Sequence, residues 1–466
     1  MDVKKVLKDP QAHINSQKVP PSTLFCNQLS LLQHQHQNLT KQLKASQAEK
    51  GTIARQFKDA KADPVLIEQL KQEMQRASAT LGQAEAAVKA VLDRTRELLC
   101  TQAPVAKPLL PSRFTNNLSL YGKSLEFYWV VDPNDLGWQK FVAQQGDKAS
   151  IYHLPAILGA IQTVFGHSSK ILIACDQGII VGGLPLTLVR SRIFGQHAVS
   201  VPFFNYGGPL TAYSDVAEQL IEQSRTSLAA DAVEQIEIRT TIKGLPFPCS
   251  DKKVSMIRRL PAEDAELDTE LGAKVRAQVN KALVHKPTVR FGGLELLEDF
   301  YRVFAINMRD LGTPVYSKAW FKLLIQTQGL NSILVVCYVN AKPVSVGFLL
   351  GYQGILEIPW ASTLKSANGL NMNMWMYRQI LAHAIAEGYG YFDFGRSTQD
   401  ASTYKFKKQW GALPVAHYWY YQTPSGQLSG GNNPDNPKFK LLIAIWQKMP
   451  VWLTKLIGPP IVKNIP

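Results

Sequence analysis

The segment Tyr391–Ala412, YFDFGRSTQDASTYKFKKQWGA, combines a strand-like beginning, a glycine and a basic helical stretch. Its first residues place the carboxylate of Asp393 among aromatic side chains, and a turn on Gly395 is expected next. A short helix over 403–409 then carries Lys405, Lys407 and Lys408. Fixed positive charge beside free backbone N–H groups suits a phosphate or a developing oxyanion. The same pattern also fits a strand–helix turn whose lysines are only solvated.

The length and composition around this segment indicate a globular protein with more than one domain. The chain has 466 residues, of which 45% are hydrophobic and 19% charged, and such a length exceeds a single ordinary core. A formal net charge of +15 favours an anionic partner, which is a nucleic acid, a phosphorylated substrate or a membrane surface. The charge alone does not choose among them.

Compartment and metal content are predicted from what the sequence lacks. The five cysteines form no CxxC pair, which favours reduced thiols in a cytoplasmic protein over a disulfide frame or a zinc site. Neither a signal peptide nor a run of about 18 apolar residues is visible. The histidines have no metal-ligand spacing, so no bound metal or other cofactor is expected.

The N-terminal part predicts an antiparallel coiled-coil hairpin over 24–100. Seam positions recur at alternating intervals of three and four residues from Leu29 to Phe57 and again from Leu70 to Leu98. Asp63 and Pro64 break the pattern between the two helices. A flexible N-terminus is expected before the hairpin, over 1–23, and a proline-rich linker after it, over 101–113. The hairpin is either an RNA-binding arm or a dimerisation element.

Two α+β domains are expected next, over 114–265 and 266–422, before a linker and basic amphipathic tail over 423–466. In the second domain, helix 294–308 precedes a loop over 309–316, three strands, helix 371–387 and the segment quoted above. The first domain has a similar order, so two copies of one fold are expected. Its segment Ser200–Leu210, SVPFFNYGGPL, lines a substrate cleft or makes a tight turn under an aromatic core.

Five motifs in order resemble the FemAB-related proteins, in particular the branch associated with exosortase (PEP-CTERM) and exopolysaccharide gene clusters. They are VPFFNYGG (201–208), MRDLGTPVY (308–316), PWAST (359–363), FDFGRS (392–397) and TYKFKKQWGA (403–412). The resemblance implies tandem acetyltransferase-like (GNAT) domains that pass an aminoacyl group from aminoacyl-tRNA to an amine. The hairpin resembles the tRNA-binding arm of seryl-tRNA synthetases. Characterised family members carry it within the second domain, whereas here it is N-terminal.

The resemblance also assigns roles to residues. The pair Phe406-Lys407 matches an FK pair in the characterised transferases, which implies that Lys407 stabilises charge. Asp393 accepts the amine proton or orients Arg396. The other substrate-binding candidates are Arg396, Ser397, Tyr404, Lys405, Lys408, Arg309, Asn205, Tyr206 and Trp360. The RNA-binding candidates of the hairpin are Lys41, Lys44, Lys50, Arg55, Lys58 and Lys61.

Alternatives remain for the donor, the activity and the tail. Neither domain has the Q/R-x-x-G-x-G/A loop of acyl-CoA-dependent acetyltransferases, which favours an aminoacyl-tRNA donor over acyl-CoA. The acceptor is expected to be an amine-bearing sugar or a lipid-linked precursor. A non-catalytic module that binds tRNA or polysaccharide is the other reading. The basic tail either rests on the inner face of the membrane or packs on the preceding domain.

Overall fold

The computed structural model describes residues 8, 23–59, 64–101, 110–191, 195–231, 233–423 and 437–465. The chain divides into two compact units, Met1–Leu109 and Leu110–Pro466, which are considered separately. Most of the expected N-terminal segment 1–23, most of the expected linker 101–113, Lys61 and the connection 424–436 lie outside the described residues.

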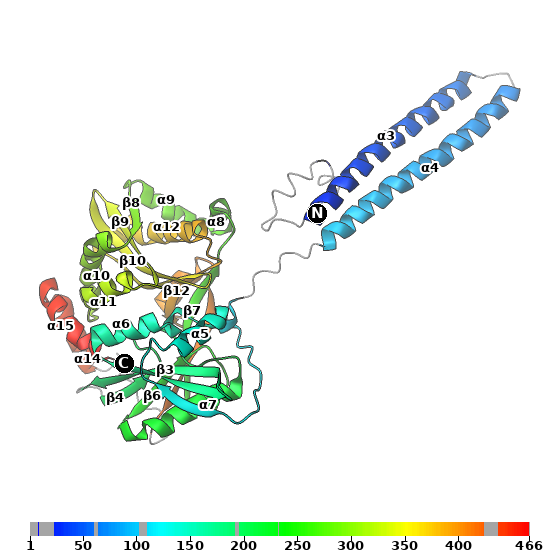
Figure 1. Cartoon of the computed structure of the whole chain (residues 1–466). Helices are drawn as coiled ribbons and strands as arrows, with labels where there is room; N and C mark the ends of the chain where they lie inside the picture. Colours follow the sequence, from blue (N-terminus) through cyan, green and yellow to red (C-terminus); the bar gives the residue numbers. More distant parts are fainter. Residues whose placement is uncertain are drawn as a thin grey trace. The chain divides into compact units, whose positions relative to one another are not determined.

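The first unit is the expected antiparallel helical hairpin (Figure 1). It consists of α3 (Thr23–Asp59) and α4 (Pro64–Thr101). The predicted seam is confirmed, since its residues on both helices are buried: Leu29, Leu32, Ile53, Leu70, Ala77 and Val91. Of the basic residues, Lys41, Lys44 and Arg55 are exposed, whereas Lys50 is half-buried because it occupies a seam position. Lys58 lies within α3, but its side chain is outside the described part.

The second unit is built on one mixed sheet of thirteen strands. Its strand order is β1-β2-β3-β4-β6-β13-β7-β12-β11-β10-β9-β8, with β5 paired to β3. The strands are β1 (Glu126–Val130), β2 (Ser168–Asp176), β3 (Ile179–Ser191), β4 (Gly195–Val199), β5 (Leu210–Thr211), β6 (Gln235–Thr240), β7 (Cys249–Arg259), β8 (Thr288–Gly292), β9 (Asn331–Val339), β10 (Lys342–Tyr352), β11 (Ile355–Thr363), β12 (Tyr391–Thr398) and β13 (Leu413–Gln422).

The helices of this unit connect and cover the strands. They are α5 (Leu136–Gln144), α6 (Pro155–Phe165), α7 (Ser214–Leu228), α8 (Asp264–Glu270), α9 (Ala273–Leu283), α10 (Leu297–Leu311), α11 (Lys318–Gln326), α12 (Met372–Ala386), α13 (Ser402–Lys408), α14 (Pro437–Lys448) and α15 (Val451–Lys463). In the part of the chain that the structure describes, no helix is long and apolar enough to cross a membrane.

The two halves of the sheet repeat one arrangement, as the sequence predicts. Apart from the two-residue strand β5, each half runs strand, two helices, three strands, helix, strand: β1 to β6 in the first half and β8 to β12 in the second. In each half the last of these strands pairs in parallel with the third strand of the antiparallel set, β4 with β6 and β11 with β12. The fold is therefore α+β with two acetyltransferase-like copies.

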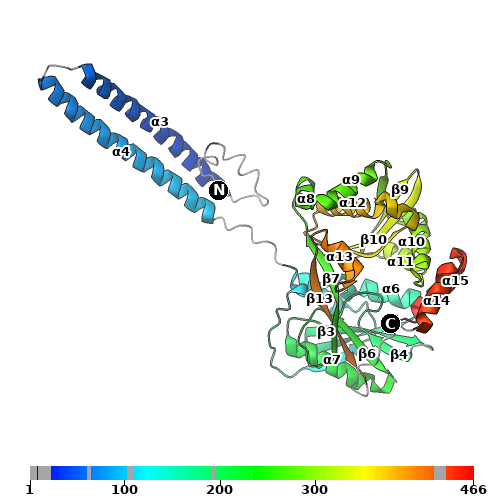
Figure 2. The same ribbon diagram turned by 180° about the vertical axis from the view of Figure 1, so that it is seen from behind.

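The two copies exchange their final strands. β13, the last strand of the second half, lies between β6 and β7 of the first half, and β7 in turn pairs with β12. In Figure 2 β7 and β13 run side by side from one half to the other. The exchange was not expected from the sequence, because local periodicity predicts a strand without indicating its partner. It makes the sheet continuous across both halves.

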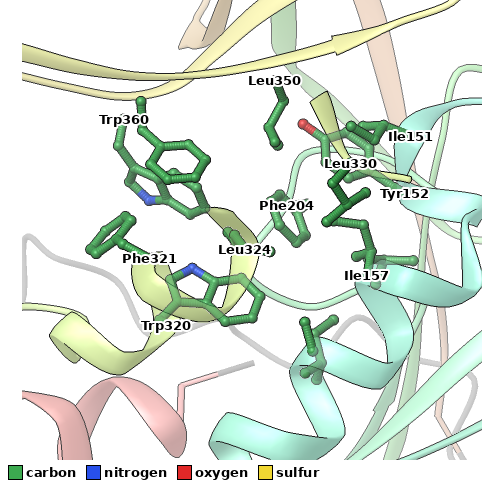
Figure 3. Packing of buried hydrophobic residues seen from close by; sticks show 14 of the residues in the cluster. Ile151, Tyr152, Ile157, Phe204, Trp320, Phe321, Leu324, Leu330, Leu350 and Trp360 are labelled. Carbon is green, nitrogen blue, oxygen red and sulfur yellow. The ribbon is translucent and has the colours of Figure 1, made fainter. Parts of the chain in front are cut away.

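Aromatic residues from both halves share one core. Phe204 of the first half packs with Trp320 of α11 and Trp360 of β11, and Trp360 also packs with Trp320 and with Phe321 of α11, with ring centroids 5.3 to 6.3 Å apart (Figure 3). Trp360 is only 8% exposed. It therefore belongs to the core, and its contacts are those of a packing residue rather than of a sugar-binding one.

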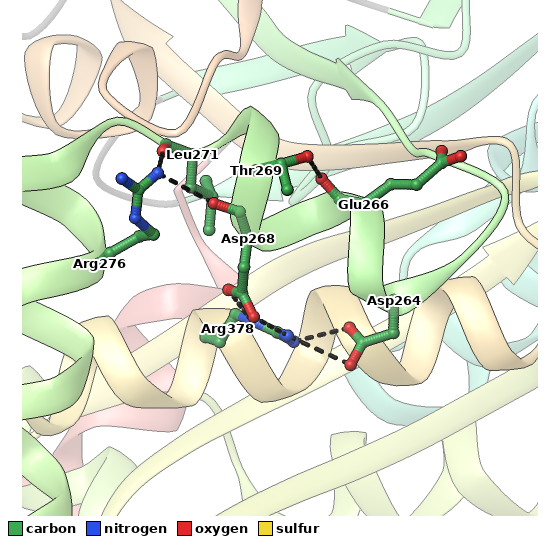
Figure 4. Close-up of polar contacts among 7 residues, drawn as sticks. All are labelled: Asp264, Glu266, Asp268, Thr269, Leu271, Arg276 and Arg378. Carbon is green, nitrogen blue, oxygen red and sulfur yellow. Dashed lines mark hydrogen bonds and ion pairs between the residues drawn. The ribbon is translucent and has the colours of Figure 1, made fainter.

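An ion-pair cluster fastens the chain where it passes from the first half into the second. Arg378 of α12 reaches the carboxylates of both Asp264 and Asp268 on α8, with N–O distances of 2.8 and 2.9 Å (Figure 4). This bonding lowers the pKa of Asp268. Because the planar guanidinium engages two carboxylates at once, it fixes the orientation of α8 on α12.

The predicted helix over 294–308 ends three residues earlier than the observed helix α10. The prediction placed Arg309 in a loop, whereas α10 continues to Leu311 and ends at Gly312, whose φ of +75° provides a left-handed cap. Arg309 therefore has a helical backbone. Its guanidinium pairs with Asp310 at 2.6 Å and donates to the carbonyl of Met449 at 3.2 Å, so it binds the C-terminal segment.

Candidate active site

The candidate site lies where β11 and β12 separate. The parallel ladder between them has three residue pairs and ends at Glu357 and Asp393. Beyond this point β12 continues along β7, and β11 continues along β10. Because the two residues are directly opposed in the ladder, their carboxyl groups project from the same face of the sheet. Both are buried, with exposures of 3% and 0%.

The equivalent opening in the first half is closed by the chain itself. Beyond Val199 and Glu237, where the ladder of β4 and β6 ends, the N–H of Ser200 donates to the carbonyl of Glu237 at 2.9 Å. The N–H of Gly207 donates to the carbonyl of Arg239 at 3.0 Å. Segment 200–208 thus fills the opening between β4 and β6. Its residue Asn205 contacts Glu357 at the opening between β11 and β12.

Gly395 shapes the opening on the β12 side. Its φ is +77°, and a Cβ atom there would lie 3.0 Å from the carbonyl oxygen of Ile358. Its N–H donates to Oδ1 of Asp393 at 2.8 Å. The expected turn at Gly395 is wrong: the glycine forms an irregularity inside the strand, which continues to Thr398, because its positive φ bends the backbone without ending the strand.

We expect Gly395→Ala to lower the free energy of unfolding by about 1–3 kcal/mol, because a side chain is strained at this φ and meets a fixed carbonyl. The substitution also disturbs the N–H that positions Asp393, so activity should fall with stability. Urea unfolding measures the first effect. Gly369→Ala is the matched control, since its Cβ would have nothing within 4 Å. Equal losses in the two variants would contradict this account.

Lys407 of α13 lies under the same opening. Its Nζ donates to the carbonyl oxygens of Gly395 and Arg396 at 2.9 and 2.8 Å. An ammonium group has three N–H bonds, so a third donor is left for another acceptor. Burial lowers the pKa of Lys407 to about 8, although the charges of Asp393 and Glu357 act in the opposite direction. Lys405 and Lys408, on the same helix, are exposed.

The two carboxyl groups have strongly altered proton affinities. Burial, and then the charge of Asp393, raise the pKa of Glu357 to about 8. Burial also raises the pKa of Asp393, while the hydrogen bond from the N–H of Gly395 opposes the shift. Two like charges so close are costly, so ionisation of one carboxyl group raises the proton affinity of the other. Oδ2 of Asp393 is buried and has no hydrogen bond.

The first half supplies the other side of the site. Asn205 donates to Oε1 of Glu357 at 3.3 Å, and its carbonyl accepts from Trp419 at 3.2 Å. The Tyr152 hydroxyl is buried beside Glu357, whose charge together with burial raises the tyrosine pKa well above its usual value. The ring of Tyr206 stands edge-on to Tyr152, with centroids 5.1 Å apart. Both halves therefore contribute to one polar cluster in an aromatic surround.

A surface pocket borders this cluster at Tyr206, and its lining does not include Glu357, Asp393 or Lys407. Its empty volume is about 540 Å³, including open solvent at its mouth, and its lining includes Arg113, Lys148, Ser150, Tyr206 and Gly208. Burial raises the pKa values of Glu357 and Asp393, and the charge of Arg113 partly opposes this rise. Arg113, which lines the pocket, is therefore also close enough to act electrostatically on the carboxyl pair.

The neutral histidine His153 holds the glycine turn at Gly208, which lines the pocket. Nδ1 of His153 accepts from the N–H of Ser150 at 3.0 Å, so Nε2 carries the proton and donates to the Gly208 carbonyl, also at 3.0 Å. Burial lowers the pKa of His153 to about 4. The imidazole is therefore uncharged at neutral pH and acts as a brace for the glycine turn.

The structure brings some of the sequence-predicted residues together. Lys407, Asp393, Asn205 and Tyr206 meet in the cluster described above. Arg396 contributes its backbone carbonyl, while its guanidinium lies 5.4 Å from the ring centroid of Trp419, where burial and then the charge of Arg239 lower its pKa.

Other predicted residues lie outside the cluster or point away from it. Arg309 binds the C-terminal segment, and Trp360 and Tyr404 pack in hydrophobic cores. Ser397 is buried, and its Oγ has no hydrogen-bond partner. Lys405 and Lys408 face solvent.

Sequence reasoning missed Glu357, Tyr152 and Arg113. The signal for Glu357 was present, because it is the single carboxylate in the apolar strand ILEIPWAST. The same signal drew attention to Asp393. Tyr152 and Arg113 had no local signal, since their proximity to Glu357 comes from the packing of one half on the other.

Within the described residues, no group of three or more His, Cys, Asp or Glu side chains could hold a metal ion. The polar cluster combines a proton acceptor, a buried ammonium and orphaned polar atoms at a break in a sheet. Such a set can hold an acyl donor and manage one proton.

The fold and the match to a family model define the class of protein. Residues 273–408 match the family model described as "Acetyltransferase (GNAT) domain", which covers β8 to α13 and therefore the β11–β12 opening. The chain is an acyltransferase. The crystal structure of FemX is similar to it, with a TM-score of 0.50 and 13% identity over 68% of this chain and 100% of FemX. No curated protein matches the sequence.

Two further solved structures are similar at lower scores. A tandem GNAT protein from the clavulanic acid biosynthesis pathway has a TM-score of 0.43 and 10% identity, over 66% of this chain and 100% of that protein. The C-terminal domain of a putative lysylphosphatidylglycerol synthetase from Agrobacterium fabrum also has a TM-score of 0.43 and 10% identity, over 62% and 91%. The likeness to FemX concerns the fold. The exosortase-associated branch and the tRNA-binding role of the hairpin stay predictions.

Proposed function

We propose that this acyltransferase works in the cytoplasm and transfers an aminoacyl group from aminoacyl-tRNA to an amine of a cell-envelope or exopolysaccharide precursor. The observation that carries the proposal is the buried Glu357–Asp393 pair beside Lys407 at the separation of β11 and β12. Acyl-CoA is the alternative donor, because the domain that matches is an acetyltransferase (GNAT) domain. The exposed basic side chains on α3 support the tRNA donor.

The chemistry needs one proton acceptor and one oxyanion partner. The acceptor amine attacks the carbonyl carbon of the donor, a C–N bond forms, and ionised Glu357 takes the amine proton. The remaining N–H of Lys407 donates to the oxyanion that develops on the carbonyl oxygen. The ester or thioester bond then breaks, and Glu357 returns the proton to the leaving oxygen or sulfur. Asp393, held by the N–H of Gly395, keeps Glu357 basic.

Parallel incubations with labelled aminoacyl-tRNA and labelled acetyl-CoA test the donor, with a panel of amino sugars as acceptors. We expect label transfer from aminoacyl-tRNA and none from acetyl-CoA. A variant lacking residues 1–104 should lose transfer from aminoacyl-tRNA if the hairpin holds the tRNA. Turnover with acetyl-CoA alone would replace the tRNA donor by acyl-CoA.

The pH profile tests the role of Glu357. Because the ionised form takes the proton, kcat/KM should rise with pH through about 8, the raised pKa of this residue. The charge of Asp393 is one cause of that shift, so Asp393→Asn should move the rise to lower pH. Ionisation of the acceptor amine itself would give a rise that does not move. An unshifted profile in Asp393→Asn would therefore remove Glu357 from the role of base.

A further inference from the structure

We propose that the outward faces of α14 and α15 bind the surface of an anionic lipid bilayer. This inference does not depend on the acyl donor or on the catalytic residues. It concerns the two C-terminal helices, which the structure places on α10 of the second half.

The inner faces of these helices are occupied. A Cβ atom on Gly312, at the end of α10, would lie 2.4 Å from the side chain of Ile443, so α14 approaches the backbone of this glycine closely. Gly458 of α15 is in similar contact with Val315, and the carbonyl of Lys463 is 2.6 Å from Nε2 of His167. The two helices are therefore an integral part of the domain, and this leaves one face of each uncovered.

The uncovered faces are strongly apolar. Leu441, Leu442 and Ile445 of α14 are 63%, 59% and 46% exposed, and Trp452 and Leu456 of α15 are 67% and 66% exposed. Residues four apart lie on one side of a helix, so each helix presents an apolar stripe. Neighbouring large apolar side chains at this exposure mark an interaction surface.

The charge of the segment selects the partner. Between 436 and 466 the sequence has five lysines, at 438, 440, 448, 455 and 463, and no aspartate or glutamate. Lysines around exposed leucine and tryptophan side chains are typical of helices that lie in the interface of an anionic membrane. A second copy of the chain fits poorly, because two such faces would bring lysines against lysines without a counter-charge.

The dimensions favour a helix pair that lies on the membrane surface. α14 and α15 have 12 and 13 residues, whereas a helix needs about 20 apolar residues to span a bilayer. Their connection at Pro450 and the prolines Pro459 and Pro460 within α15 divide the segment further. Shallow insertion of the apolar stripes, with the amine of exposed Lys448 at the lipid phosphates, satisfies both the apolar and the charged side chains.

Vesicle flotation with the full-length protein tests the proposal. Vesicles of phosphatidylcholine alone are compared with vesicles that also contain phosphatidylglycerol. We expect the double variant Trp452→Ser/Leu456→Ser to bind the anionic vesicles at least about tenfold more weakly than the unaltered protein. Leu120→Ser, at a residue that is 79% exposed elsewhere, is the apolar control and should bind normally.

Because the whole chain is basic, the charge effect needs its own control. Lys448→Glu should weaken binding to anionic vesicles about tenfold. Lys281→Glu changes the net charge by the same amount at an exposed residue of α9, and it should have a much smaller effect on binding. Transfer to a water-soluble acceptor should be unchanged in Trp452→Ser/Leu456→Ser.

Three results would overturn the proposal. One is equal binding of these variants and their controls to the anionic vesicles. Another is the absence of vesicle binding by the unaltered protein. The third is a dimer in solution that Trp452→Ser/Leu456→Ser converts to a monomer, because a second copy of the chain would then be what covers this face.

Discussion

Glu357→Gln is expected to lower the rate of acyl transfer by a factor of about 10²–10⁴, the usual contribution of a general base. The amide has nearly the shape of the carboxylic acid and can keep the contact with Asn205, but it cannot take the amine proton. Single-turnover assays at fixed pH measure the loss. Lys281→Gln, on an exposed helix face, is the control and should leave the rate unchanged.

The stability advantage of Glu357→Gln over the wild type should grow as the pH rises. The pKa of Glu357 is raised in the folded state, so between about 4.5 and 8 the folded protein holds a proton that the unfolded chain has released. Stability therefore falls as the pH rises through this window, by at most about 1.4 kcal/mol per pH unit for one proton. Glutamine removes this penalty, so the Tm difference between variant and wild type should grow from pH 5 to pH 8.

These two outcomes separate catalysis from structure. If Glu357 served only in packing, its replacement would lower the stability of the protein, and the Tm difference from the wild type would not grow with pH. Loss of activity together with a Tm difference that is constant across the pH range would show that the pKa of Glu357 is not raised in the folded protein. Full activity in a folded Glu357→Gln protein would exclude it as the base.

Lys407→Met is expected to lower the rate by about 10²–10³ and also to destabilise the protein. The methionine fills a similar volume but leaves the carbonyls of Gly395 and Arg396 without their buried donor, which costs about 1–3 kcal/mol for each group. It also removes the positive charge beside the carboxyl pair, so the pKa of Glu357 should rise further and the kcat/KM profile should move to higher pH. Urea unfolding and the pH profile measure the two effects.

A second lysine variant separates charge from shape. Lys407→Arg keeps the charge, but its planar fork does not reproduce three N–H directions from one nitrogen. We expect it to restore the pH profile more fully than the maximal rate. If Lys407→Met lowered stability yet left both the rate and the pH profile unchanged, the lysine would serve only to cap the β12 backbone.

Much of the site was predictable because several of its residues stand in distinctive local sequence patterns. Asp393 stands alone among aromatic residues in a strand, and Lys407 lies in a short helix with a known pair motif. The hairpin was predictable for the same reason, since its seam repeats over many turns. Gly395 was recognised as special, although its positive φ produced a bulge rather than a turn.

The remainder depends on contacts between distant parts of the chain. Asn205 and Tyr152 reach Glu357 only because the first half packs against the second. Nothing in the periodicity of Leu413–Gln422 indicates that β13 joins the strands of the first half. The register of each strand and the choice of its partner are set by the assembled sheet, so they cannot be predicted from the sequence pattern of one segment.

The exchange of β7 and β13 governs how the second unit can be taken apart. A fragment that stops after the first half would lack the strand between β6 and β7, and a fragment that begins after it would lack the neighbour of β12. Each would expose open edges that invite aggregation. During synthesis, β6 must wait for its second partner, which is made about 180 residues later, so folding should be slow and all-or-none. The exchange therefore makes the two halves one folding unit, which cannot be divided at the boundary between them without leaving unpaired strand edges on both sides.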